Sequence, residues 1–115
     1  MANIGKMKKF ITIKISNERY IKLKFSEILF IESDGDYSKI YVIRKDIIKY
    51  AVHLSLTRAI EILDERFSRC HKRYIINCDF IEEIKNWNIQ IGEYNIPISE
   101  LNKKEILEKV NYIHK

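Results

Sequence analysis

A run of basic side chains between residues 66 and 77 is the part of the sequence best suited to chemistry. The segment reads RFSRCHKRYIIN and contains no carboxylate. Because like charges repel, crowding them costs stability unless an anion binds among them. Arginine can hold a phosphate or carboxylate through two parallel hydrogen bonds, and lysine can meet the same group as a point charge. The segment therefore predicts an anion-binding surface, and the competing interpretation is a charged sheet edge that discourages aggregation.

The net charge of +5 also favours an anionic partner, and its distribution is more informative than its size. The first 17 residues contain four lysines and no acid, and residues 66–78 form a second basic stretch without acids. With 46% hydrophobic and 32% charged residues, the chain has the composition of a globular domain. Two acid-free basic stretches on one such domain indicate a polyanion or an anionic surface as partner.

Residues that could support catalysis or bind a metal are not assembled into a recognisable motif. Cys70 and His71 are neighbours, and neighbours on a strand point to opposite faces, so they cannot act as nucleophile and base. Cys70 and Cys78 lack the paired spacing of a zinc site, and we expect both to be reduced, small core residues. The acids around Gly35 suit a tight turn rather than an EF-hand, which needs flanking helices. We therefore expect no catalytic residue, no metal and no cofactor.

The elements that must position the basic stretch belong to a mostly β domain. Apolar residues alternate in FITIKI (10–15) and YIKLKF (20–25), which predicts two strands joined by a turn. Three more short strands follow, separated by turns at residues 34–36 and 45–46. Apolar residues then recur every three or four positions, which predicts a helix from about 55 to 66.

Caps and faces can be assigned in the second half of the chain. Ser55 is the expected N-cap of the first helix. Strand patterns return between residues 74 and 98, and a C-terminal helix follows, with Asn102 and Glu105 in the spacing of a capping box. Alternation through residues 69–74 would place three basic side chains on one face of a strand or connection.

The length of 115 residues predicts one domain. We expect residues 1–9 to be a basic N-terminal extension or linker and residues 10–115 to fold. No apolar run reaches the length that crosses a bilayer, and the first residues lack the apolar segment of a secretory signal. We therefore expect a cytoplasmic protein with no membrane partner.

Five short segments occur in an order that is typical of one family. They read ILFIES (28–33), YSKIYV (37–42), HLSL (53–56), FSRCHKRYIIN (67–77) and IPIS (96–99). In the strand and helix context predicted above, they resemble the LytTR DNA-binding domain, the C-terminal output module of many bacterial response regulators. The resemblance spans about residues 10 to 112. Its most specific parts are Glu32 and the F-x-R-x-H-x-x-Y-x-x-N block that ends at Asn77.

The resemblance implies an elongated arrangement of short antiparallel sheets, with one helix after the fifth strand and one C-terminal helix. It also implies sequence-specific binding of duplex DNA through three loops that enter successive major grooves. The implied candidates for base contact are Ser38, Lys72 and Glu100. The implied candidates for phosphate contact are Lys39, Arg69, His71, Arg73, Ser99 and Lys103. Glu32 and Asn77 would support the loops from inside.

Two residues depart from the family pattern. Glu100 stands where the third loop commonly has an arginine, and a carboxylate accepts from cytosine N4 but repels phosphate. Arg73 stands where a serine is usual and adds positive charge to the second loop. The sequence thus predicts a non-enzymatic transcriptional regulator of bacteria that binds double-stranded DNA at repeated sites, with a receiver domain or a second copy as further candidate partners. The competing interpretation is a β-rich protein-interaction or RNA-binding module without catalytic activity.

Overall fold

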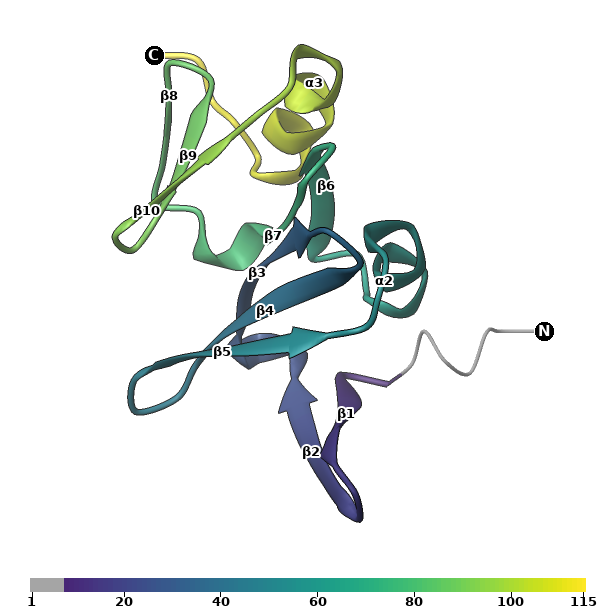
Figure 1. Cartoon of the computed structure of the whole chain (residues 1–115). Helices are drawn as coiled ribbons and strands as arrows, with labels where there is room; N and C mark the ends of the chain where they lie inside the picture. Colours follow the sequence, from purple (N-terminus) through teal and green to yellow (C-terminus); the bar gives the residue numbers. More distant parts are fainter. Residues whose placement is uncertain (1–7) are drawn as a thin grey trace, which may run out of the picture.

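Residues 8–115 are described by the computed structural model, and they form three antiparallel sheets and two α-helices (Figure 1). The first sheet is a hairpin of strands β1 (Phe10–Ser16) and β2 (Arg19–Lys24). The second sheet has five strands in the order β5-β4-β3-β7-β6, and the third has three in the order β10-β9-β8. The molecule is elongated, with principal extents of 52 × 38 × 28 Å. The predicted mostly β architecture of short sheets is confirmed.

The remaining elements follow the predicted order, with one helix after the fifth strand and one near the C-terminus. The strands of the second sheet are β3 (Ile28–Asp34), β4 (Tyr37–Ile43), β5 (Ile47–Val52), β6 (Phe67–His71) and β7 (Tyr74–Asn77). The strands of the third sheet are β8 (Glu83–Lys85), β9 (Asn88–Ile91) and β10 (Tyr94–Pro97). The helices are α2 (Leu56–Ile62) and α3 (Glu100–Lys109), with short 3-10 turns η1 (Phe25–Glu27) and η2 (Cys78–Phe80).

The five-stranded sheet separates two hydrophobic cores. Because successive strand residues point to opposite faces, Ile31 and Ile40 enter the first core, whereas Phe30 and Tyr41 enter the second. Helix α2 and the β1–β2 hairpin cover the first core. The third sheet and α3 cover the second, in which the rings of Phe30 and Tyr41 stack with centroids 4.1 Å apart. Both faces of the central sheet are therefore used for packing, and its connecting turns are left for function.

Helix α2 is shorter than the predicted span of 55 to 66, although Ser55 caps it as predicted by accepting a backbone N–H bond at 3.1 Å. The chain leaves the helix at Leu63, whose backbone is extended (φ −89°, ψ 161°). Just beyond, the Asp64 carboxylate accepts a hydrogen bond from the Arg66 N–H at 3.2 Å. A short acidic side chain that bonds the backbone two residues on competes with helical hydrogen bonding, so the helix ends early.

The basic stretch folds as a hairpin, which the alternation through residues 69–74 did not predict. Strand β6 ends at His71, and a turn at Lys72 and Arg73 leads into β7. The register between the two strands shifts between Arg69 and His71, so regular alternation stops before the turn. Lys72 and Arg73 consequently stand at the exposed tip of the hairpin.

The start of helix α3 also differs from the prediction. Ser99 is the N-cap residue (φ −78°, ψ 151°), and its hydroxyl is hydrogen-bonded to Asn102, so the capping box predicted from Asn102 and Glu105 is wrong. Ile113, which continues the apolar stripe in the sequence, lies beyond the end of the helix and is 89% exposed. Among residues 8–115, no helix combines the length and the apolar character needed to span a membrane.

Most of the predicted N-terminal extension, residues 1–7, lies outside the described residues. The boundary that separates residues 1–9 from a domain of residues 10–115 stays a prediction.

Candidate nucleic-acid interface

Two backbone hydrogen bonds bring together the three loops implied by the sequence. The Ser33 N–H donates to the Arg73 carbonyl at 2.9 Å, which ties the end of β3 to the β6–β7 turn. The Ser99 N–H donates to the Cys70 carbonyl at 2.8 Å, which ties the β10–α3 connection to the other side of the same hairpin. We call the β3–β4 turn, the β6–β7 turn and the β10–α3 connection the three-turn surface (Figure 1).

A groove of about 430 Å³ adjoins the three-turn surface. The β3–β4 turn and the connection between β5 and α2 line it, together with Arg69 and Lys72 of the β6–β7 hairpin. Tyr37 and His53 belong to its lining and meet edge to face, with ring centroids 5.3 Å apart. The groove therefore combines two cationic side chains and an aromatic pair with one carboxylate, Asp36. The cations suit a phosphate, and the aromatic pair and the carboxylate suit the face and edge of a base.

The basic side chains at the β6–β7 turn keep their charge available. Arg69 donates from Nε to the His71 carbonyl at 3.2 Å and from Nη2 to the Lys72 carbonyl at 2.7 Å. Arg73 donates from Nη2 to the Ser33 carbonyl at 3.2 Å. None of the salt bridges found within residues 8–115 involves these side chains. Carbonyl partners stiffen the turn but carry no formal charge, so the positive field of the turn is retained.

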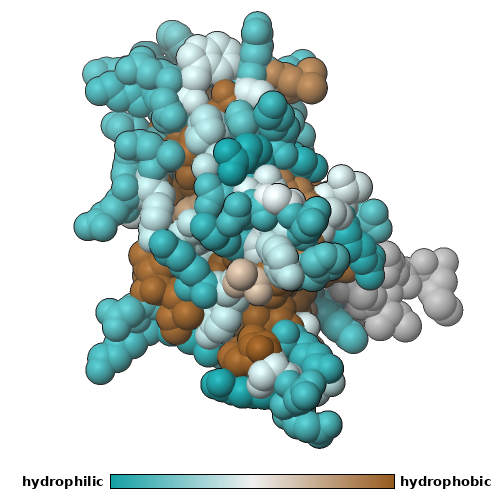
Figure 2. All heavy atoms as spheres, viewed as in Figure 1, coloured by the Kyte–Doolittle hydropathy of each residue, from teal (hydrophilic) through white to brown (hydrophobic). Residues whose placement is uncertain are grey.

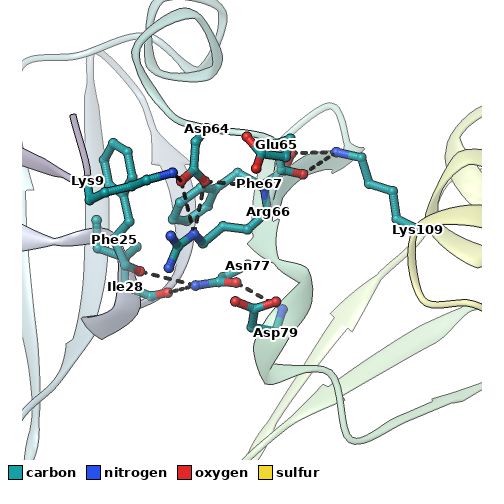
Figure 3. Close-up of polar contacts among 10 residues, drawn as sticks. All are labelled: Lys9, Phe25, Ile28, Asp64, Glu65, Arg66, Phe67, Asn77, Asp79 and Lys109. Atoms are coloured by element: carbon teal, nitrogen blue, oxygen red, sulfur yellow. Dashed lines mark hydrogen bonds and ion pairs between the residues drawn. The ribbon is translucent and has the colours of Figure 1, made fainter. Parts of the chain in front are cut away.

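Arg66 differs from the other cations of the basic stretch because it is paired with an acidic side chain (Figure 3). Its Nε donates to both carboxylate oxygens of Asp64, at 3.0 and 3.2 Å, and Lys9 Nζ lies 3.4 Å from Asp64 Oδ2. Asp64 is only 5% exposed. Burial alone would raise the pKa of Asp64, but the hydrogen bonds and charge of Arg66, with Lys9, hold it below its usual value. The Arg66 charge is thus compensated inside the fold.

Asn77 connects β7 to the start of β3 (Figure 3). It is fully buried, and its Nδ2 donates to the carbonyls of Phe25 at 3.2 Å and Ile28 at 2.9 Å. Its Oδ1 accepts from the Asp79 N–H at 2.9 Å. On the far side of the same hairpin, Lys109 donates to the carbonyls that flank Arg66, at 2.8 and 2.9 Å, and so ties α3 to the start of β6. This geometry suits the supporting role expected for Asn77.

Glu32 accepts hydrogen bonds from two tyrosines below the β6–β7 turn. Tyr41 Oη donates to one carboxylate oxygen at 3.0 Å and Tyr74 Oη to the other at 2.8 Å. Burial, reinforced by Glu32, raises the pKa of Tyr41 to about 12 and raises that of Tyr74 in the same direction. Both phenols therefore stay protonated as donors at neutral pH. Because Tyr74 follows Arg73 directly, the pair of bonds anchors the base of the turn.

The first-loop candidates differ in accessibility. Ser38 is fully buried, and its hydroxyl donates to the Leu54 carbonyl at 2.6 Å. Because this side chain is enclosed, we leave Ser38 out of the proposed interface. Lys39 lies on the opposite face of β4, and its Nζ is 3.4 Å from the Asp34 carboxylate in an exposed pair. Exposed pairs of this kind are weak, so Lys39 can exchange its partner for a phosphate.

The third-loop candidates cluster at the start of α3. Ser99 is half-buried and its hydroxyl is engaged with Asn102, whereas Glu100 is exposed in the first helical turn, where the helix dipole favours a carboxylate. Lys103 Nζ stands 4.0 Å from the centre of the Trp87 ring, a cation–π contact. The Ile98 N–H donates to the Trp87 carbonyl at 2.8 Å, which places this contact beside the β10–α3 connection.

Sequence reasoning missed three groove residues, Tyr37, His53 and Thr57. In the sequence, Tyr37 is the first residue of a predicted strand and His53 is an isolated histidine, and neither feature indicates a binding role. The signal lay in the YSKIYV and HLSL segments, which begin at Tyr37 and His53 and match the family pattern without indicating a role for either residue. Cys70, by contrast, is fully buried, and burial raises the pKa of its thiol to about 12, so the thiol is protonated at neutral pH.

A β domain whose β6–β7 turn presents cations without acidic partners has the feature expected of a polyanion-binding module. The family model of the LytTr DNA-binding domain matches residues 18–111. Because this match covers most of the chain, the protein belongs to the LytTR family and is a DNA-binding module. A comparison with curated proteins finds no match.

A solved structure has the same fold. The LytTr DNA-binding domain of a putative methyl-accepting/DNA response regulator from Bacillus cereus superposes with a TM-score of 0.73 at 18% sequence identity. The likeness covers 91% of this chain and 99% of that chain. At this identity the likeness establishes the fold alone. Statements about the site of this chain therefore rest on the contacts of its own side chains.

Proposed function

We propose that the three-turn surface binds duplex DNA sequence-specifically, with its turns in successive major grooves, and that the protein thereby regulates transcription in a bacterial cytoplasm. The observation that carries this proposal is the uncompensated charge of the β6–β7 turn, held between two other turns by backbone hydrogen bonds. A rigid turn loses little conformational entropy on binding. The favourable energy of its charge contacts is therefore not offset by the cost of ordering the turn.

Phosphate and base contacts are divided between different side chains. Arg69 donates to the His71 and Lys72 carbonyls, and Arg73, which lies in the turn, donates to the Ser33 carbonyl of β3. The remaining N–H groups of both arginines suit phosphate oxygens. Lys72 is exposed at the tip and is the candidate for a guanine O6 and N7 contact. His71, Ser99 and Lys103 are further phosphate candidates at the flanks, with Lys39 on β4 beside the first turn. Glu100 is the base-contact candidate of the third turn, where it would accept from a cytosine amine.

The regulatory context that we propose is supported by the solved structure of the same fold, which is described as a domain of a putative response regulator. We propose that this domain likewise acts as an output module that binds repeated DNA sites, controlled by a receiver domain or by pairing with a second copy. Nothing in the proposal requires catalysis, because DNA recognition is carried by charge and by hydrogen bonds to phosphates and base edges.

A selection from a random duplex library would identify the preferred sequence and supply the test. Lys72→Ala should reduce the discrimination between selected and random duplex by about 1–3 kcal/mol, because alanine cannot donate to the base edge. Lys45→Ala, at an exposed lysine of the distant β4–β5 turn, is the matched control and should leave discrimination unchanged.

Equal weakening of Lys72→Ala on selected and random duplex would remove Lys72 from base reading. A wild-type protein that binds single-stranded RNA more tightly than any duplex, or that binds no duplex at low salt, would contradict the proposed function as a whole. Affinity for duplex should fall steeply with salt, with a slope of about −0.9 in log K against log salt for each phosphate contacted.

A further inference from the structure

The β1–β2 hairpin presents a second basic surface, separate from the three-turn surface. Opposing residues of an antiparallel pair share a face, and the register pairs Phe10 with Lys24, Thr12 with Lys22 and Lys14 with Tyr20. All three lysines are exposed, and Tyr20 is 63% exposed. We call the face that carries Lys14, Lys22 and Lys24 the hairpin strip. Lys22 Nζ lies 4.0 Å from the centre of the Phe10 ring, which positions its charge without neutralising it.

Two acidic residues near the root of the hairpin strip are engaged with other cations, and the acid of the hairpin turn itself, Glu18, is followed directly by Arg19. Glu27 pairs with Arg44 at 3.4 Å, and Asp64 pairs with Arg66 and Lys9. Within the described part of the chain, no salt bridge involves a lysine of the hairpin strip. A pocket of about 270 Å³ at the root of the hairpin is lined by Lys9, Phe10, Lys22, Lys24, Ser26 and Arg66. The strip therefore runs from this cationic pocket out along the hairpin with its charge uncompensated.

The hairpin is rigid enough to present these charges in a fixed arrangement. Its inner face contributes Ile13 and Leu23 to the first core, where both are buried. Its root is fixed by the Phe25 N–H, which donates to the Lys9 carbonyl at 2.8 Å. Lys22 and Lys24 are two residues apart on one strand, which separates them by about 6.7 Å. This spacing is comparable to that between successive phosphates of one DNA strand.

The position of the hairpin suits a backbone contact outside the recognised sequence. Figure 1 shows the hairpin projecting from one end of the molecule, with the third sheet and α3 at the other end and the β3–β4 and β6–β7 turns between them. Figure 2 shows hydrophilic residues at its far end. The molecule is 52 Å long, whereas one turn of B-DNA is about 34 Å, so a domain aligned with the duplex extends over flanking DNA.

From these observations we infer that the hairpin strip binds the phosphate backbone of duplex DNA that flanks the site recognised by the three-turn surface. The inference rests on the proposed function. Lysines contribute here as point charges without base contacts, so the strip should increase affinity and leave sequence preference unchanged. A duplex is the favoured occupant because the strip lies on a domain that already binds DNA and carries regularly spaced cations.

Duplex length separates this contact from those of the three-turn surface. Fluorescein-labelled duplexes would contain the selected sequence alone, or that sequence extended by about 10 base pairs, one helical turn, at either end. The test variant combines Lys14→Gln, Lys22→Gln and Lys24→Gln in the full chain. The control combines Lys45→Gln, Lys85→Gln and Lys115→Gln, which removes the same charge from exposed lysines elsewhere.

The wild-type protein and the control should bind the duplex extended at one end more tightly than the short duplex. The test variant should bind that extended duplex about ten-fold more weakly and keep its affinity for the short one. Its salt slope on the extended duplex should be shallower by about 0.9 for each phosphate that the strip no longer neutralises. Thermal unfolding of both variants establishes that they fold.

Two results would overturn the inference while leaving the proposed function intact. One is that the wild-type protein binds neither extended duplex more tightly than it binds the short duplex. The other is that the test variant and the control have the same affinity for every duplex, which would show that the hairpin strip does not contact flanking DNA. Failure of the wild-type protein to bind any duplex would instead remove the proposed function, and the two failures are therefore distinguishable.

Discussion

Arg66 and Arg73 come from the same basic stretch but have different surroundings. Arg66 is held against the buried Asp64 carboxylate at 3.0 Å, whereas Arg73 is exposed and donates to a backbone carbonyl. The first contributes to the stability of the fold and little to the external field. The second contributes to the field and little to stability. The charge available to a partner therefore depends on which cations the fold has already paired, and the net charge does not report this.

The largest change in stability is expected at Asn77, which lies among the buried polar contacts on the Arg66 side of this comparison. Asn77→Ala should destabilise the fold by about 3 kcal/mol, because two carbonyls and one N–H lose their partner in a buried site. Urea unfolding followed by circular dichroism measures this change. Asn95→Ala, at an exposed position of β10, is the control and should have little effect. An Asn77→Ala protein as stable as this control would show that Asn77 does not support β3 and β7.

Asp64→Asn should destabilise the fold at pH 7 by about 2 kcal/mol, because Arg66 and Lys9 lose their charged partner. The lowered pKa of Asp64 also predicts a pH dependence. Its contribution is complete above the unfolded-state value of 3.8 and is lost as pH falls through the lower folded-state pKa. In urea unfolding across this pH range, the variant should therefore lose less stability than the wild-type protein on acidification, whereas the exposed-site control Asp46→Asn should follow the wild-type curve.

The pair Arg66→Gln and Arg73→Gln tests the comparison directly. Arg66→Gln should destabilise the fold by about 1.5 kcal/mol, because buried Asp64 loses its main partner. It should leave the salt slope on the short selected duplex unchanged. Arg73→Gln should retain wild-type stability and make that slope shallower by about 0.9, as expected for one phosphate contact. A shallower salt slope for Arg66→Gln together with a loss of stability for Arg73→Gln would refute the assignment of Arg66 to stability and Arg73 to DNA binding.

The smallest destabilisation among the variants of buried or half-buried groups is expected for Glu32→Gln, which weakens the hydrogen bonds from Tyr41 and Tyr74. We expect a destabilisation of about 1 kcal/mol, with Glu93→Gln as an exposed control. Because Tyr74 anchors the β6–β7 turn, affinity for the selected duplex should also fall while affinity for random duplex changes less. Equal loss on both duplexes would argue that Glu32 acts on overall stability alone.

Elements with clear apolar alternation were predicted well. The β1–β2 hairpin has apolar residues at every second position, and strands β3 to β5 are short apolar runs bounded by turn residues, so these patterns were sufficient. Strand β6 was missed because Phe67 completes a helix-like stripe and Ser68, although buried, is polar. The premature end of α2 was missed because it depends on a hydrogen bond from Arg66 to the Asp64 carboxylate.

The candidate site was predicted in part. The order of motifs led to the LytTR family, and the match to residues 18–111 confirms that membership. Residue type alone could not show that Ser38 is enclosed beneath Leu54, or that Tyr37 and His53 line one groove. Those facts depend on contacts between segments that are 16 residues apart, and nothing in either segment reports the other.

Local sequence was sufficient to establish the mostly β fold, the family and the presence of an acid-free basic stretch, because alternation, turn residues and local charge are properties of neighbouring residues. Which of those charges remain available depends on tertiary contacts, because the fold buries Asp64 beside Arg66 and brings Lys9 to the same carboxylate. Backbone hydrogen bonds from Ser33 and Ser99, which are distant in the sequence, hold the β6–β7 hairpin in place. Pairing in three dimensions, set by burial and geometry, determines which cations remain available to DNA.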